Sequence, residues 1–150
     1  MRLRHFIVGV AIAAAVFFLP PFFIPRGAFG PGPSDFSTRL VGDYFIFRTS
    51  ADEIIISPES WTEGTPEIPT KVVEYAVHRR LILAKRQGLK RLDPNRSYEE
   101  PDPAVFDYWI LDTSAPKVFG PMSLDQFSAK RRELSVPESV TLKDVYSFRW

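Results

Sequence analysis

Few side chains in this sequence of 150 residues are suited to acid–base or metal chemistry, because it contains two histidines and no cysteine. The lack of cysteine excludes disulfide bonds, thiolate metal sites and a cysteine nucleophile. His78 is the histidine that falls in the globular part of the chain, and Arg79 and Arg80 follow it directly. Neighbouring cations disfavour a charged imidazole and repel a metal ion. We therefore expect His78 to lie in a solvent-exposed turn.

Carboxylates are the remaining groups with catalytic potential. A small enzyme that used carboxylates alone, for example to cleave a glycan, would need two of them across a cleft. Asp43, Glu74 and Asp107 are the candidates for such a pair. The sequence has no HExxH motif, no Gly-rich phosphate loop and no G-x-S-x-G context. We therefore assign no catalytic, cofactor-binding or metal residue and expect a protein without enzymatic activity.

A basic segment is the first candidate binding site. Residues 79–96 contain seven basic side chains and one acid, whereas residues 99–112 contain five acids and no basic residue. The basic segment would bind an anionic lipid surface, with each charge contributing on the order of 1 kcal/mol. In the alternative, the two segments neutralise each other. Nucleic acid is not expected, because no aromatic residues are interleaved with the charges. The basic residues are Arg79, Arg80, Lys85, Arg86, Lys90, Arg91 and Arg96.

The aromatic end of the chain is the second candidate binding site. Tyr146, Phe148 and Trp150 occupy every second position. On a β-strand their rings would share one face. They would either close the edge of a sheet or form an exposed strip that docks a partner protein.

The start of the chain indicates where these residues are located in the cell. Arg2 and Arg4 precede an apolar run that reaches 20 residues over positions 6–25, which is long enough to cross a bilayer of ~30 Å. We expect residues 1–25 to be an uncleaved single-pass anchor in the cytoplasmic membrane with the N-terminus inside. Cleavage as a signal peptide, followed by secretion, is the alternative. Residues 26–38 are rich in Gly and Pro and predict a tether. Residues 39–150 would then form one extracytoplasmic domain in the periplasm.

The domain is predicted to be mainly β. Residues 40–49 and 53–57 predict a first hairpin, and residues 106–111 and 117–119 predict a third pair of strands. Residues 71–86 predict a second hairpin, with a single helix as the alternative. The helix signature comes last: Ser123-Leu124-Asp125-Gln126 is a capping box that opens a helix ending before Pro137. We expect residues 99–103 to be a stiff acidic linker rather than a calcium loop, because EF-hand spacing is missing.

These elements predict an α+β fold: a mostly antiparallel sheet of five to six strands with one C-terminal helix packed on one face. Residues 44–47 and 108–111 are apolar at successive positions, which is typical of strands buried on both faces. One helix covers only one face of a sheet. The other face would be covered by curling of the sheet, by the loop 89–104, by the membrane or by another protein.

Four segments belong together here: Val72–Lys85, Tyr108–Asp112, Val118–Ser123 and the helix to Leu134. With these segments, the chain resembles a family of small bacterial proteins classed only as a domain of unknown function. Members of that family carry an N-terminal anchor or a lipoprotein signal, but this chain lacks the lipoprotein cysteine. The resemblance implies a fold and a location but no activity. A shorter stretch, Trp109 through Leu124, is similar to the bacterial relatives of GYF peptide-binding domains. The family resemblance covers about Gly42 to Leu142 and rests on these four segments.

The leading hypothesis is a membrane-anchored extracytoplasmic domain that binds another envelope protein and catalyses no reaction. It rests on the anchor, the tether and the uncovered apolar sheet face. The alternatives are a carboxylate-dependent envelope enzyme and an anionic-lipid binder that uses residues 79–96. No cofactor is expected.

Overall fold

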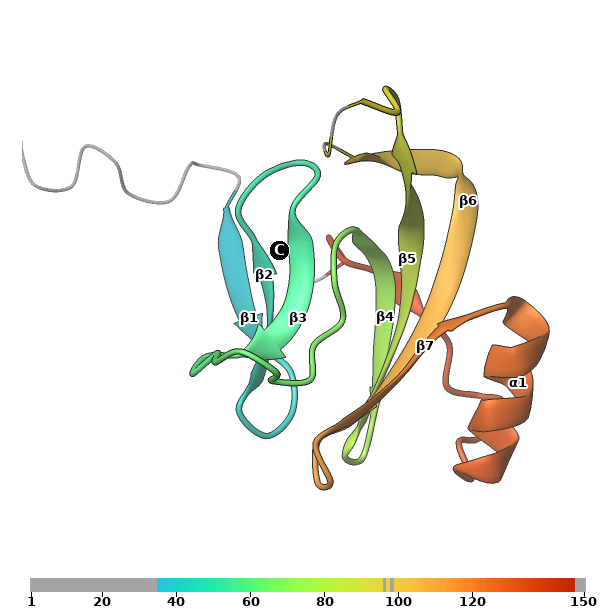
Figure 1. Cartoon of the computed structure of the whole chain (residues 1–150). Coiled ribbons are helices and arrows are strands. Elements are labelled where there is room, and N and C mark those ends of the chain that lie inside the picture. The colour runs from blue at the N-terminus through green and yellow to red at the C-terminus, as the bar shows by residue number, and fades with distance from the viewer. Residues whose placement is uncertain (1–34, 96, 98, 148–150) are drawn as a thin grey trace, which may run out of the picture. The chain divides into compact units, whose positions relative to one another are not determined.

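The computed structural model describes residues 35–95, 97 and 99–147 (Figure 1). The predicted anchor and most of the predicted tether lie outside these residues. Within the described part of the chain, no helix is long and apolar enough to span a membrane. The elements are β1 (Phe36–Arg39), β2 (Tyr44–Arg48), β3 (Ile54–Pro58), β4 (Val72–His78), β5 (Leu81–Arg91), β6 (Glu99–Asp112), β7 (Lys117–Met122), α1 (Leu124–Glu133) and β8 (Lys143–Asp144).

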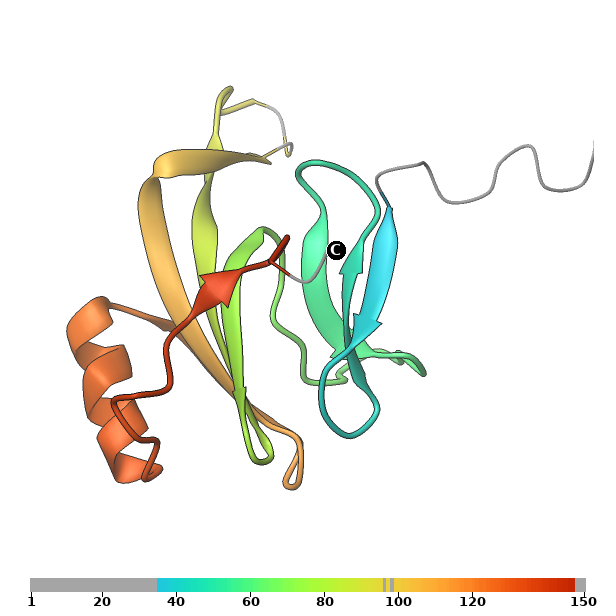
Figure 2. The ribbon, with the colours of Figure 1, turned by 180° about the vertical axis from the view of Figure 1, so that it is seen from behind.

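The strands form two antiparallel sheets (Figure 2). The smaller sheet has the order β1-β2-β3, and the larger has the order β7-β6-β5-β4-β8. The α+β, mostly antiparallel prediction is confirmed, but the prediction of a single sheet of five to six strands is wrong. The connection between β3 and β4 explains the division. It contains Gly64, Pro66 and Pro69, which oppose a continuous strand ladder, and its backbone pairs with β3 through an isolated bridge between Ile56 and Ile68.

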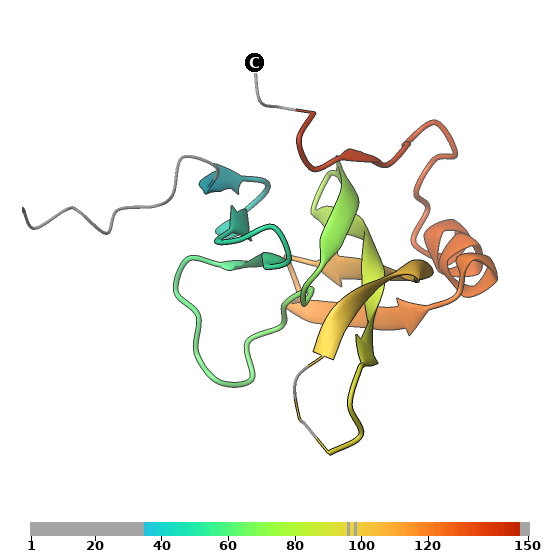
Figure 3. The same cartoon turned by 90° about the horizontal axis from the view of Figure 1, so that it is seen from above.

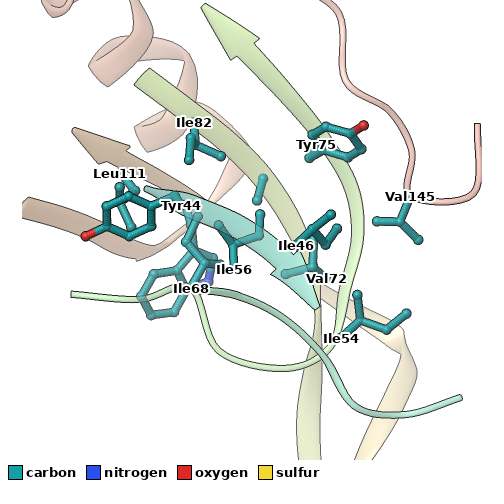
Figure 4. Close-up of a cluster of buried hydrophobic side chains, with 12 residues drawn as sticks. Tyr44, Ile46, Ile54, Ile56, Ile68, Val72, Tyr75, Ile82, Leu111 and Val145 are labelled. Carbon is teal, nitrogen blue, oxygen red and sulfur yellow. The ribbon is translucent and has the colours of Figure 1, made fainter. Parts of the chain in front are cut away.

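The smaller sheet covers one face of the larger one. Ile46, Ile54 and Ile56 from the smaller sheet pack in one buried cluster with Ile82 and Leu111 from the larger sheet (Figure 4). All five side chains are at most 1% exposed, so each contributes roughly 1.5–3 kcal/mol through burial. The apolar face that the sequence leaves without a cover is therefore filled by the chain's own first three strands.

The helix covers the opposite face, so the described domain has three layers (Figure 3). Phe127 of α1 is 2% exposed and packs with Leu83 and Ile110. Its ring stacks on Tyr108 at 5.0 Å between centroids. Because successive residues of a strand alternate in direction, β5 and β6 contribute apolar side chains to both clusters.

The predicted capping box is present at the start of α1. The Ser123 hydroxyl accepts a hydrogen bond from the Gln126 N–H at 3.3 Å, and the Gln126 side-chain oxygen accepts one from the Ser123 N–H at 2.9 Å. At the other end, the N–H groups of Ser135 and Val136 donate to the carbonyls of Arg132 and Arg131. This is a Schellman-type end with Ser135 in the left-handed region at φ 56°.

One further prediction is confirmed and two differ from the structure. Residues 71–86 lie in a hairpin, as predicted, and not in a helix. β1 begins at Phe36, inside the segment assigned to the tether. The prediction of an acidic linker at residues 99–103 is wrong, because these residues form the start of β6 and residues 99–102 pair with β5. Pro101 and Pro103 are tolerated there because β7 pairs with β6 only from Tyr108 onward, so this outer edge needs no backbone donors.

Candidate functional site

β5 and β6 extend beyond the rest of the larger sheet as a two-stranded arm, which we define as residues 88–106 (Figure 1, top). β4 pairs with β5 only as far as Arg86. At the base of the arm, Gln87 pairs with Phe106 but Gly88 pairs with Asp102, so residues 103–105 form a bulge. Val105 folds over Gly88, where an added Cβ atom would lie 2.9 Å from the Val105 Cγ1 atom. A side chain at position 88 would therefore have to displace the Val105 side chain, which is 51% exposed.

The arm carries half of the exposed large apolar side chains of the described residues. Eight such side chains are exposed, and four of them lie on the arm: Leu89 at 38%, Leu92 at 59%, Val105 at 51% and Phe106 at 41%. Several exposed apolar side chains on one projecting element indicate a candidate interaction surface. The arm is thus the candidate docking element, and residues 89–104 are not the covering loop considered from the sequence.

The basic residues 79–91 do not form one surface. Arg79 and Arg80 lie at the β4–β5 turn, whereas Lys90 and Arg91 lie at the far end of β5. At about 3.3 Å per residue, the two groups are roughly 30 Å or more apart. Lys85 is adjacent to Arg86 in β5, so their side chains leave opposite faces of the sheet. Arg96 lies outside the described residues.

Carboxylates accompany most of these cations. The salt bridges are Arg80–Asp112 at 3.6 Å, Lys85–Glu74 at 3.0 Å, Arg86–Asp107 at 2.7 Å, Lys90–Asp102 at 3.9 Å and Arg91–Glu99 at 3.7 Å. Among the described basic residues 79–91, Arg79 is the one that forms no salt bridge with a carboxylate. The arrangement favours mutual neutralisation over an uncompensated basic surface.

The three candidate carboxylates are not brought together. Glu74 lies opposite Lys85 and Asp107 lies opposite Arg86, so the sheet itself separates the two acids. Asp43 is exposed in the turn between β1 and β2. None of the three can pair with another across a cleft as glycan cleavage requires. Among the described residues, no group of three His, Asp or Glu side chains is arranged to hold a metal ion.

Asp107 instead belongs to a polar cluster at the base of the arm. Arg86 donates to both oxygens of Asp107, from Nε at 2.9 Å and from Nη2 at 2.7 Å. Arg86 also donates to the Thr70 carbonyl at 3.1 Å and lies 5.1 Å from the centre of the Trp109 ring. The Trp109 indole N–H completes the cluster by donating to Asp107. These contacts give hydrogen-bond partners to both the Arg86 guanidinium and the Asp107 carboxylate. The ion pair therefore stabilises the base of the arm.

Tyr146 lies in a turn after β8 and not on a strand, so the prediction of a shared strand face does not hold for it. Its ring meets that of Phe36 edge-on at 6.1 Å. Arg48 donates from Nε to the Tyr146 hydroxyl at 3.2 Å. Tyr146 thus packs against the smaller sheet, while Phe148 and Trp150 lie outside the described residues.

Asp112, at the end of β6, has a pKa below the usual range of a carboxyl group. Burial alone would raise this pKa, but hydrogen bonds from the Ser114 hydroxyl and N–H, the charge of Arg80 and the Ala115 N–H outweigh it. The two Ser114 bonds are 2.8 and 2.9 Å long. The ionised Asp112 side chain therefore stabilises the β6–β7 turn by accepting these hydrogen bonds.

Asp112→Asn should make the protein less sensitive to acid. Because the folded-state pKa lies below the unfolded value of about 3.9, ionised Asp112 stabilises the fold fully above that value. The stabilisation disappears as pH falls through the folded-state pKa. Between pH 6 and pH 3, the urea midpoint of unfolding should therefore fall further in the parent protein than in Asp112→Asn. An equal fall in both would contradict this assignment.

The geometry defines a class: a three-layer α+β domain of two antiparallel sheets and one helix, extended by a β-arm. The chain belongs to the family described as "Protein of unknown function (DUF3997)", which matches residues 41–146. No curated protein and no solved structure matches the chain. The similarity to GYF domains is not supported by these comparisons.

Proposed function

We propose that this chain is a membrane-anchored, extracytoplasmic binding module that docks another envelope protein through its arm and catalyses no reaction. The observation that carries the proposal is the exposure of Leu89, Leu92, Val105 and Phe106 on the projecting arm. Truncating a central apolar anchor of an interface typically costs 1 kcal/mol or more. The arm provides several such anchors on one element.

The charges of the arm argue against two other binding partners, namely anionic lipid and a second copy of this chain. Residues 88–106 contain three basic and four acidic side chains, a net charge of −1, so anionic lipid gains little attraction. A symmetric antiparallel dimer centred on Lys90 and Arg91, or on Glu99 and Glu100, would place these charges against their own copies. Like charges directly opposite each other are destabilising. A different protein with an apolar strip flanked by both signs of charge fits better.

The test is in-cell photocrosslinking of the full chain with a photoreactive amino acid at Leu92 or at Leu124. These two leucines are matched in exposure, at 59% and 56%, but Leu124 lies on the helix. We expect a discrete protein adduct from Leu92 and none from Leu124. The purified partner should then bind at least tenfold more weakly to Leu89→Ser/Phe106→Ser, with unchanged circular dichroism.

Three outcomes would overturn the proposal. Equal adducts from both positions would mean random collision. An adduct of twice the chain's mass would identify a second copy. Crosslinks to lipid alone would mean that the arm binds the membrane surface and not a protein.

A further inference from the structure

A hollow of about 280 Å³ lies at the end of the domain opposite the arm. The β4–β5 turn forms one wall, and Leu134 and Ser135 after α1 form the other. Its polar lining comes from His78, Arg79, Arg80, Asp112 and Ser135. The hollow belongs to none of the features used in the proposed function.

Both walls contain a residue in an unfavourable backbone conformation. Arg79 and Ser135 each have a φ of 56°, and they are the non-glycine residues with positive φ in the described part of the chain. The left-handed region disfavours residues with a Cβ atom, and glycine or asparagine is preferred in two-residue hairpin turns. Such outliers concentrate at functional sites. Arginine at position 79 therefore needs a reason other than the turn itself.

The charges around the hollow leave a net positive lining. The Asp112 carboxylate already accepts hydrogen bonds from Ser114 and from the Ala115 N–H, and it lies 3.6 Å from Arg80. The carbonyls of Arg131 and Arg132 at the end of α1 accept from Val136 and Ser135, which limits the negative potential of the helix end. Within the described residues, Arg79 has no carboxylate in salt-bridge range. Its guanidinium is thus available to an external anion.

We infer that this hollow binds a small oxyanion, such as phosphate, sulfate or a carboxylate, with Arg79 as the main cation and Arg80 and His78 beside it. A guanidinium presents paired N–H donors that match two oxygens of such an anion. The hollow has ample room for a group of this size. The unfavourable φ of Arg79 is then the conformational cost of placing this cation on the rim.

The test is a titration of inorganic phosphate at constant ionic strength, followed by amide NMR shifts of the full chain in a phosphate-free maltoside detergent. We expect saturable shifts at residues 78–81 and 135. Arg79→Gly should weaken binding at least tenfold and raise the unfolding midpoint, because glycine accepts the positive φ. A structural arginine would not show this combination. Arg132→Gln, which removes an exposed arginine outside this hollow, should leave binding unchanged.

A second experiment identifies the source of the anion. Vesicles with phosphatidylglycerol are compared with vesicles of phosphatidylcholine alone. Arg79-dependent binding to the anionic vesicles, without binding of inorganic phosphate, would place the site on a lipid headgroup. The inference is overturned by unsaturable shifts, by unchanged binding in Arg79→Gly or by an equal loss in Arg132→Gln. None of these results bears on the arm, so the two proposals are tested separately.

Discussion

Gly120→Ala should strongly destabilise the protein. A Cβ atom at this position of β7 would lie 2.5 Å from the Trp109 Cε3 atom, and the glycine has a φ of 150°. Trp109 is 8% exposed and is held by Asp107 and Arg86, so it cannot move away. Overpacking and an unfavourable φ each cost about 1–3 kcal/mol. We expect a loss of about 3–5 kcal/mol in the free energy of unfolding, measured by urea denaturation.

Gly64→Ala is the matched control. Gly64 also has a positive φ, at 83°, but an added Cβ atom would meet nothing within 4 Å. Only the backbone cost remains, roughly 1–2 kcal/mol. If the two variants lost equal stability, the close approach of Gly120 to Trp109 would not be the cause.

Local patterns in the sequence were sufficient to predict the helix and the hairpins. The capping box at Ser123 specifies its hydrogen bonds within four residues, so neighbouring sequence determines the helix start. The hairpin predicted at residues 71–86 similarly follows from two β-rich runs around a charged turn. These are short-range features, and they are the ones that the structure reproduces.

The division into two sheets depends on contacts that no local pattern contains. Ile46 and Ile56 pack against Ile82 and Leu111 from strands that are far away in the chain. Apolar residues at successive positions indicate burial on both faces, but they do not identify the covering element. The apolar pattern of these strands therefore predicts an uncovered sheet face but does not identify β1, β2 and β3 as its cover.

The arm was missed because its charges and prolines are typical of a loop. One signal was nevertheless present: the basic residues before Asp93 and the acids after position 98 stand in mirror order. Lys90 faces Glu100 and Arg91 faces Glu99 in the observed register. Opposite charges arranged symmetrically about a turn favour an antiparallel pair. Reading residues 79–112 as two strands would have predicted the pairing and divided the basic segment.

Arg86→Met should be the second strongly destabilising variant. Methionine keeps most of the side-chain volume but leaves Asp107 as an unpaired charge, and the two side chains are only 12% and 17% exposed. Breaking a buried ion pair by removing one partner costs about 3–5 kcal/mol. Because the two side chains keep some access to solvent, we expect a loss of about 3 kcal/mol in the free energy of unfolding. Urea denaturation measures this loss.

Two further variants separate this ion pair from its neighbours. Arg91→Met breaks a pair whose side chains are 51% and 42% exposed, so its loss should stay below about 1 kcal/mol. Arg86→Met/Asp107→Asn should recover part of the stability, because asparagine carries no charge and keeps an oxygen for the Trp109 indole. If the double variant were no more stable than Arg86→Met, the contacts of Arg86 with Thr70 and the Trp109 ring would account for the loss, and not the unpaired carboxylate.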